Sequence, residues 1–205
     1  MPLLHCIVMT AQPLLQLTAA DYLAFERAAE GRHEWVNGQV YAMGGASPEH
    51  SLIVTNLARE LSLALKGRPC RVHTTDLRVR VDETGLYTYP DGVVVCGEPR
   101  YDDAQRDTLV NPLVLIEVLS ASTEAYDRGA KFEHYRRLES LAAYLLVAQD
   151  RPHLELFRRL ADGTWQLTEA SGLEKSLEIP ELGIHLALAE VYEKVAGLGA
   201  AIPDS

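Results

Sequence analysis

The stretch NPLVLIEVLSASTEAYDRGAKFEHYRR, residues 111–137, places one acid inside a run of apolar residues. Apart from Glu117, every residue from Leu113 to Leu119 is apolar, as in a strand that is buried on both faces. Burying an ionised carboxylate is costly unless a cation, a proton or good hydrogen-bond donors meet it. The sequence therefore raises the question of which partner Glu117 meets.

The segments on either side of this stretch predict a mixed α/β (α+β) fold, with a mixed β-sheet core flanked by helices and a hairpin near each end. Cap and turn residues set most of the boundaries, such as Asn37-Gly38 for a hairpin and Ser47-Pro48 for a helix start. The predicted helices cover residues 17–30, 47–66, 122–138 and 186–197. The predicted strands cover residues 70–81, 89–97, 112–120 and 142–149, and the predicted hairpins cover 32–43 and 154–168.

The length of 205 residues favours one domain, which we expect over residues 14–198. An N-terminal tail over 1–13 and a C-terminal tail over 199–205 flank it, and residues 1–8, before Met9, are expected to be dispensable, as either an upstream start or a tail. No apolar run is long enough to span a bilayer. Cys6, Cys70 and Cys96 lack metal-ligand spacing and suit a reducing compartment without disulfides, so the sequence predicts a cytoplasmic location.

The formal net charge of −10 opposes nonspecific coating of nucleic acid. A local basic surface remains compatible with that charge, and a solvated helix face is the alternative account of the same residues. The candidates for this surface are Arg128, Lys131, Arg136, Arg137, Arg151, Arg158 and Arg159.

Alternation along a strand places Glu117 on the same face as Leu115 and Leu119. The preceding buried strand carries its own acid, Asp91, and neighbouring strands would bring the two carboxylates together. Like charges at that distance cannot both stay ionised unaided, and a divalent metal such as Mg²⁺ or Mn²⁺ resolves the repulsion. On the following helix, Asp127, Lys131 and Tyr135 form one stripe at i, i+4 and i+8, so Lys131 could reach the same point.

These segments resemble a known family. The text YPDGVVVC (89–96) together with residues 111–137, HEWVNGQVYAM (33–43) and SPEHSLIVTNLARELSLAL (47–65) is similar to the Uma-two family of restriction endonucleases. That family falls within the PD-(D/E)XK nuclease superfamily, and the resemblance covers roughly residues 14–195.

The resemblance implies that Asp91 and Glu117 bind the metal and that Lys131 orients water or stabilises charge on the phosphate. It adds Glu49 and His50 as further candidates, and Glu34, in the first predicted hairpin, is expected to face the same pocket. It also implies a restriction-endonuclease-like fold, a DNA substrate and a homodimer. The superfamily pattern places its lysine two residues after the acid, where this chain has Leu119, and Lys131 in the next helix is the implied replacement.

Each candidate also has a structural explanation. Glu117 could form a buried ion pair with Lys131, and Asp91 could serve only as a turn residue. Lys131 could be solvated, Glu49 could interact only with the helix dipole, and Glu34 could belong to a cross-strand pair.

We expect a metal-dependent endonuclease that hydrolyses DNA phosphodiester bonds. The alternative is a catalytically silent protein of the same fold that binds DNA or another partner. A glycosidase that uses two carboxylates is disfavoured, because the sequence lacks the aromatic platform residues that such an enzyme would need near its acids.

Overall fold

The computed structural model describes residues 13–198, which form three β-sheets with helices packed against them. The tails predicted over 1–13 and 199–205 lie outside the described residues, apart from residue 13. The expected α+β class is confirmed, with two six-stranded mixed sheets. In the described part of the chain, no helix is long and apolar enough to cross a membrane.

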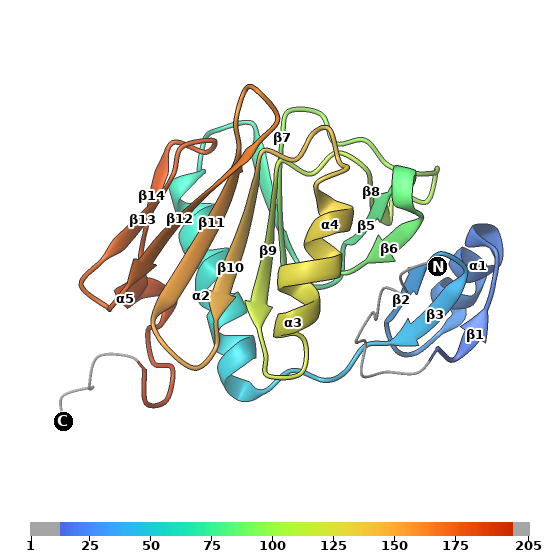
Figure 1. The fold of residues 1–205 in the computed structure, drawn as a ribbon, viewed down its shortest axis with the longest axis horizontal. Coiled ribbons are helices and arrows are strands. Elements are labelled where there is room, and N and C mark those ends of the chain that lie inside the picture. Colours follow the sequence, from blue (N-terminus) through green and yellow to red (C-terminus); the bar gives the residue numbers. More distant parts are fainter. Residues whose placement is uncertain (1–12, 199–205) are drawn as a thin grey trace, which may run out of the picture.

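The central sheet has the strand order β12-β11-β10-β9-β7-β4 (Figure 1). Its strands are β4 (Cys70–Thr74), β7 (Gly92–Cys96), β9 (Val114–Leu119), β10 (Ala143–Ala148), β11 (His153–Arg159) and β12 (Trp165–Ser171). β9 and β10 pair in parallel, and every residue of both is buried, as their apolar runs predict. The other pairs in this sheet are antiparallel.

The second sheet has the order β1-β3-β2-β6-β5-β8. Its strands are β1 (Leu15–Gln16), β2 (His33–Val36), β3 (Gln39–Ala42), β5 (Arg78–Val81), β6 (Leu86–Thr88) and β8 (Thr108–Leu109). Asn37 and Gly38 have φ of 48° and 95°, so the predicted turn joins β2 and β3. The single strand predicted over 70–81 is wrong, because residues 75–77 carry the chain from β4 in one sheet to β5 in the other.

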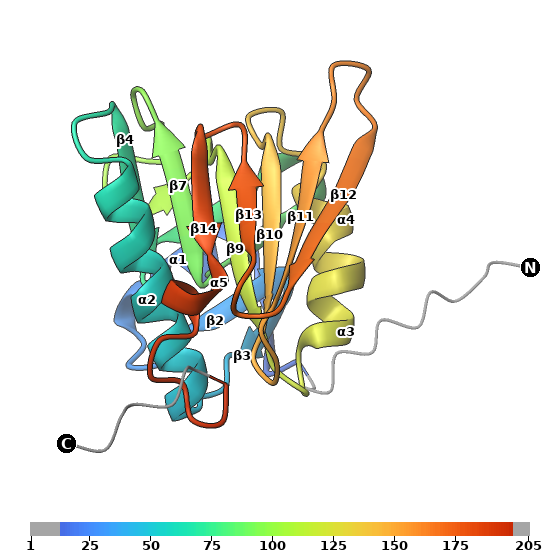
Figure 2. The ribbon, with the colours of Figure 1, turned by 90° about the vertical axis from the view of Figure 1, so that its left-hand side faces the viewer.

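Helices cover both faces of the central sheet (Figure 2). The helical segments are α1 (Ala19–Ala28), α2 (Pro48–Ala64), η1 (Asp82–Thr84), α3 (Glu124–Tyr126), the π-helical η2 (Asp127–Lys131), α4 (Phe132–Tyr135) and α5 (Leu188–Val191). On one face, α2 packs with α5 and the hairpin of β13 (Ser176–Ile179) and β14 (Ile184–Ala187). On the other face, α4 and the second sheet enclose a core with Leu115 and Leu119.

The C-terminal helix predicted over 186–197 is largely wrong. Residues 184–187 form strand β14, and the helix that follows, α5, is only four residues long. Residues of β14 are alternately buried and exposed, so the strand, paired with β13, buries its apolar side chains on one face.

The prediction of no disulfide is also wrong for two of the three cysteines. Cys70 and Cys96 are direct cross-strand partners of β4 and β7, with Cα atoms 4.0 Å apart, and their sulfurs are bonded. Register places them together although 26 residues separate them in sequence. The cytoplasmic location stays a prediction.

Candidate active site

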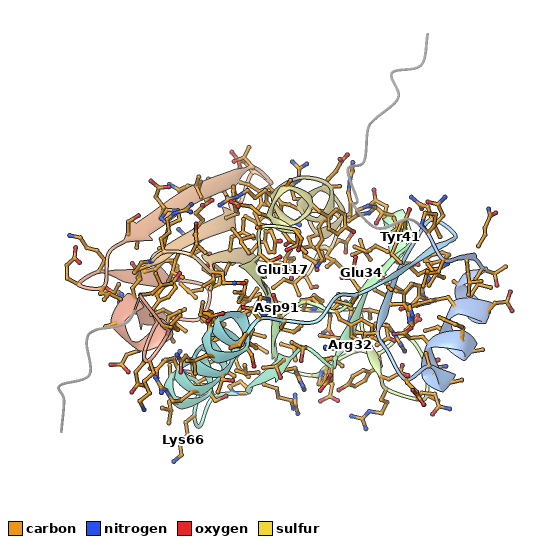
Figure 3. The ribbon with its side chains drawn as sticks, turned by 90° about the horizontal axis from the view of Figure 1, so that it is seen from below. Arg32, Glu34, Tyr41, Lys66, Asp91 and Glu117 are labelled. Carbon is orange, nitrogen blue, oxygen red and sulfur yellow. A yellow bond between two sulfur atoms is a disulfide. The ribbon has the colours of Figure 1, made fainter. Side chains whose placement is uncertain are left out.

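The pairing of β7 with β9 brings Asp91 and Glu117 to the same point. Gly92 pairs with Ile116 in antiparallel register. Asp91, just before Gly92, therefore lies opposite Glu117, just after Ile116. Asp91 Oδ2 accepts a hydrogen bond from the Val118 backbone N–H at 2.8 Å. Figure 3 shows both side chains between the two sheets. A Cβ on Gly92 would lie 3.1 Å from Ile116, so glycine permits this close approach.

Lys131 is the cation that meets Glu117. Its Nζ lies 2.8 Å from Glu117 Oε1, 3.3 Å from Glu34 Oε1 and 3.4 Å from Asp127 Oδ1. Tyr135 donates a hydrogen bond to the same Glu117 oxygen at 2.8 Å. All five side chains are buried, so one ammonium faces three carboxylates away from bulk water.

A π-helical turn aims two of these groups inward. The helix predicted over 122–138 is interrupted by η2, in which Asp127 and Lys131 are both buried. The wider turn keeps the 3.4 Å ion pair between them while both side chains face the sheet. Such turns within α-helices are frequent at functional sites.

Burial sets the protonation of this cluster. It raises the pKa of Glu117 well above the ordinary value, and Asp127 and Asp91 add to the rise while Lys131 opposes it. Burial likewise raises the pKa of Asp127. Burial alone would lower the pKa of Lys131, but the surrounding carboxylates, with Glu117 first, raise it above its usual range. Lys131 therefore stays charged, while the raised pKa values of Glu117 and Asp127 favour the protonated forms of these two carboxyls.

His50 joins the site and Glu49 does not. His50 Nε2 lies 3.2 Å from Asp91 Oδ2, and its backbone N–H donates to the N-cap Ser47 Oγ at 3.1 Å. Burial disfavours the imidazolium, but Asp91 more than offsets it, so the pKa of His50 is raised. Glu49 sits in the first turn of α2 and is absent from the described cavity wall, which fits its alternative as a dipole partner.

Glu34 brings the second sheet into the site. It lies on β2, directly across from Tyr41 on β3, and accepts a hydrogen bond from Thr88. Its ion pair with Lys131 bridges this sheet to η2. The prediction that Glu34 faces the same pocket agrees with this geometry, and its cross-strand pairing is also present.

The cluster opens into a cavity of about 950 Å³. The cavity lies between the β2–β3 hairpin, the start of α2, the ends of β7 and β9, and α3 with η2. Asp91, Glu117, Glu34, His50, Lys131 and Asp127 all line it.

Asp91 and Glu117 fit a metal ion whose remaining coordination positions are filled by water or by phosphate oxygens. Within residues 13–198, no group of three His, Cys, Asp or Glu side chains is arranged to hold a metal ion. Asp91 and Glu117 each use one carboxylate oxygen for their protein contacts, which leaves Oδ1 and Oε2 for a ligand. Mg²⁺ is commonly bound through one or two carboxylates plus substrate phosphate, so two protein ligands suffice for it.

A family model described as "Uma2: Putative restriction endonuclease" matches residues 19–189. The chain belongs to the Uma2 family. Two proteins from Synechocystis sp., the uncharacterized proteins slr1290 and sll1609, are each 35% identical to it. The first match covers 90% of this chain and 95% of the relative, and the second covers 79% and 92%.

The fold is similar to a solved structure described as "a putative nuclease belonging to DUF820 from Anabaena variabilis". The TM-score is 0.67 at 16% identity, over 84% of this chain and 96% of that one. The restriction-endonuclease-like fold expected from the sequence is thus confirmed, and the Uma2 membership supports a nuclease at the level of the family.

The predicted basic surface is present only in part, because Arg136, Arg137 and Arg151 are exposed whereas the other four candidates are held by protein partners or buried. Arg128 pairs with Glu155 and Glu124, and Arg158 pairs with Glu181. Arg159 donates to backbone carbonyls at the end of α4, and Lys131 is buried. These four cations are therefore engaged with their own protein partners.

Sequence reasoning placed Asp127 and Tyr135 on the Lys131 stripe without counting them as site residues. The spacing i, i+4, i+8 was the available signal, and both contact the cluster. Gln149, which carried no clear sequence signal, lines the cavity and donates to Ser47 Oγ at 3.0 Å.

Proposed function

We propose that this Uma2 chain is a metal-dependent endonuclease that hydrolyses DNA phosphodiester bonds, with Asp91 and Glu117 as metal ligands and Lys131 as the catalytic cation. The observation that carries the proposal is the 2.8 Å contact between Lys131 Nζ and Glu117 Oε1. It brings a lysine from η2 to the acid on β9. Lys131 can thus replace the lysine that the superfamily pattern has at the position of Leu119. Leu119 itself is 4% exposed and packs in the core.

The metal expected here is Mg²⁺ or Mn²⁺, held by Asp91 and Glu117. When bound, it would supply Lewis-acid polarisation of the phosphate and charge neutralisation. The Val118 N–H and His50 hold Asp91 in place, and Tyr135 holds Glu117.

Lys131 has the position and charge for two tasks. Its ammonium, charged throughout the neutral range, can donate to a non-bridging phosphate oxygen or orient the attacking water. Asp127 and Glu34 hold its Nζ from two other sides, so all three N–H groups of the ammonium face carboxylates and one of these contacts gives way when a phosphate oxygen or water accepts a hydrogen bond.

The test is cleavage of labelled single-stranded and duplex oligonucleotides with Mn²⁺, Mg²⁺ or EDTA. We expect the unmodified chain to cut only with metal, and Glu117→Gln, Asp91→Asn and Lys131→Met to lose cleavage. Lys66→Met, a change of the same kind at an exposed lysine just after the end of α2, should cut like the unmodified chain (Figure 3). Metal-independent cutting, or full activity in Glu117→Gln, would contradict the assignment.

A second candidate is a catalytically silent protein of the same fold that binds DNA or another partner. The observation that favours it is the ion network around Lys131, in which the ammonium contacts three protein carboxylates and none of these contacts needs a metal. Mn²⁺ binding by isothermal titration separates the two, because a silent protein need not bind the metal at Asp91 and Glu117. The homodimer stays a prediction, which sedimentation of the full chain would test.

A further inference from the structure

The proposed reaction would take place at the bottom of a deep cavity. The side chains of Glu117 and Lys131 are each 5% exposed, and that of Asp91 is 16% exposed. Residues 43–47, between β3 and α2, line the cavity as an irregular segment and pass beside Asp91 (Figure 3). A scissile phosphate must therefore enter past this segment to meet the carboxylates.

The described wall of the cavity offers few cations to a nucleic acid. Its basic side chains are Arg32, Lys131 and His50, against the four acids Glu34, Asp91, Glu117 and Asp127, and His50 is itself paired with Asp91. Arg32 is itself held by the Thr75 carbonyl at 2.6 Å and lies 3.4 Å from Asp76. A double helix is normally bound through many phosphate contacts on a basic surface, and this cavity has no such surface among the described residues.

The cavity does offer a fixed aromatic ring. Tyr41 lines the cavity from β3, opposite Glu34, and packs against the core behind it. Its hydroxyl donates to Gln39 Oε1 at 2.6 Å, which fixes the direction of the ring. Aromatic rings of this kind bind unpaired bases by stacking, which does not depend on the base sequence.

We propose that the cavity accepts a single DNA strand, with Tyr41 as the platform for a base next to the scissile phosphate, and that it excludes an intact duplex. This inference rests on the proposed nuclease function and specifies its substrate. A single strand can insert one phosphate past residues 43–47 and leave a base free to stack on Tyr41. The bases of a duplex are stacked and paired, and its second strand must pass over an acidic wall without a cation to receive it.

The test measures binding separately from cleavage. Fluorescence anisotropy of a labelled oligothymidine, alone or annealed to oligodeoxyadenosine, is recorded with the full chain and Ca²⁺, an oxygen-binding cation. We expect binding at least tenfold tighter for the single strand. The salt dependence of log K should have a slope no steeper than about −2, because each phosphate contact contributes about −0.7 on a single strand. Equal or tighter binding of the duplex, or no binding of either, would overturn the inference.

Substitutions at Tyr41 then locate the platform. Tyr41→Leu keeps an apolar side chain against the core but removes the aromatic face, and it should weaken single-strand binding about fivefold or more. Tyr41→Phe keeps the ring and should bind within about twofold of the unmodified chain, since a base stacks on either ring. Tyr101→Leu, at a partly buried tyrosine outside the cavity wall, is the matched control. Equal binding by Tyr41→Leu and Tyr41→Phe would refute the platform.

Cleavage of the same oligonucleotides with Mn²⁺ separates this inference from the proposed function. Single-strand preference in binding with no cleavage of any DNA would refute catalysis but leave the substrate assignment standing. Cleavage of the duplex at the rate of the single strand would support catalysis and refute the assignment.

Discussion

Replacement of Lys131 by Met is the sharpest test of the charge arrangement in the buried cluster. Met keeps an unbranched apolar side chain of similar length but removes the ammonium that lies 2.8–3.4 Å from Glu117, Glu34 and Asp127. Removing one partner of a buried ion pair typically costs about 3–5 kcal/mol, because the other partner keeps its desolvation penalty. In a chain of this size, each kcal/mol of lost unfolding free energy lowers the melting temperature by about 2–4 °C. The melting temperature of Lys131→Met in EDTA should therefore be about 6–20 °C lower than that of the unmodified chain.

Glu117→Gln should behave differently in the same buffer. The amide oxygen can still accept the Tyr135 hydrogen bond, and Lys131 keeps Glu34 and Asp127 as partners. Loss of one carboxylate also relieves repulsion, since Asp127 and Asp91 both disfavour ionised Glu117. We therefore expect a change within about 1 kcal/mol, or a small gain.

Thermal melts in EDTA and in Mn²⁺ decide between these expectations. A metal present at a hundred times its dissociation constant stabilises the folded state by about 2.7 kcal/mol. Mn²⁺ should raise the melting temperature of the unmodified chain and of Lys131→Met but not of Glu117→Gln. Lys66→Met is the control for loss of a lysine charge. Equal, large losses for Lys131→Met and Glu117→Gln in EDTA, with no shift by Mn²⁺ in any protein, would show a purely structural ion pair.

Three further predictions test the surroundings of the site. In EDTA, the pKa of Glu117 is raised above its ordinary 4.5 in the folded state only, so stability should fall as pH rises above 4.5, and Glu117→Gln should flatten this fall in urea titrations. Gly92→Ala should cost about 1–3 kcal/mol in the same titrations, because its Cβ would lie 3.1 Å from Ile116. Leu119→Lys should not restore cleavage to Lys131→Met, since it places a charge among core side chains; full rescue at unchanged stability would refute a buried Leu119.

Local signals in the sequence predicted much of the fold correctly. Asn37-Gly38 and Ser47-Pro48 carry their own backbone preferences, and the hairpin and helix that they predict are present. The strand predicted over 70–81 failed because alternation continues across a change of sheet, and no local residue marks residues 75–77 as the crossing. The Cys70–Cys96 bond likewise depends on the register of β4 with β7, which is a tertiary property.

The site was predictable where strand alternation and helix spacing apply. Alternation placed Glu117 on one face of its strand, and helical spacing placed Lys131 on one stripe with Asp127. The contact of Lys131 with Glu34 could not be predicted from the sequence, because only the tertiary fold brings η2 and the second sheet together. The π turn was also invisible, since nothing in residues 127–131 distinguishes it from an ordinary helical turn.

The charge of the cluster implies an order of events for the proposed reaction. Lys131 supplies one positive charge against the three carboxylates that contact it, so the fully ionised cluster carries two negative charges and repels phosphate. The pKa of Glu117 and that of Asp127 are raised, so in the absence of metal each of these carboxyls takes up a proton at a higher pH than it would in water. A divalent cation carries the charge that would balance this negative excess, and it must displace any proton that its carboxylate ligand holds. DNA should therefore bind after the metal, because before that step the cavity is acidic and its cations are already engaged.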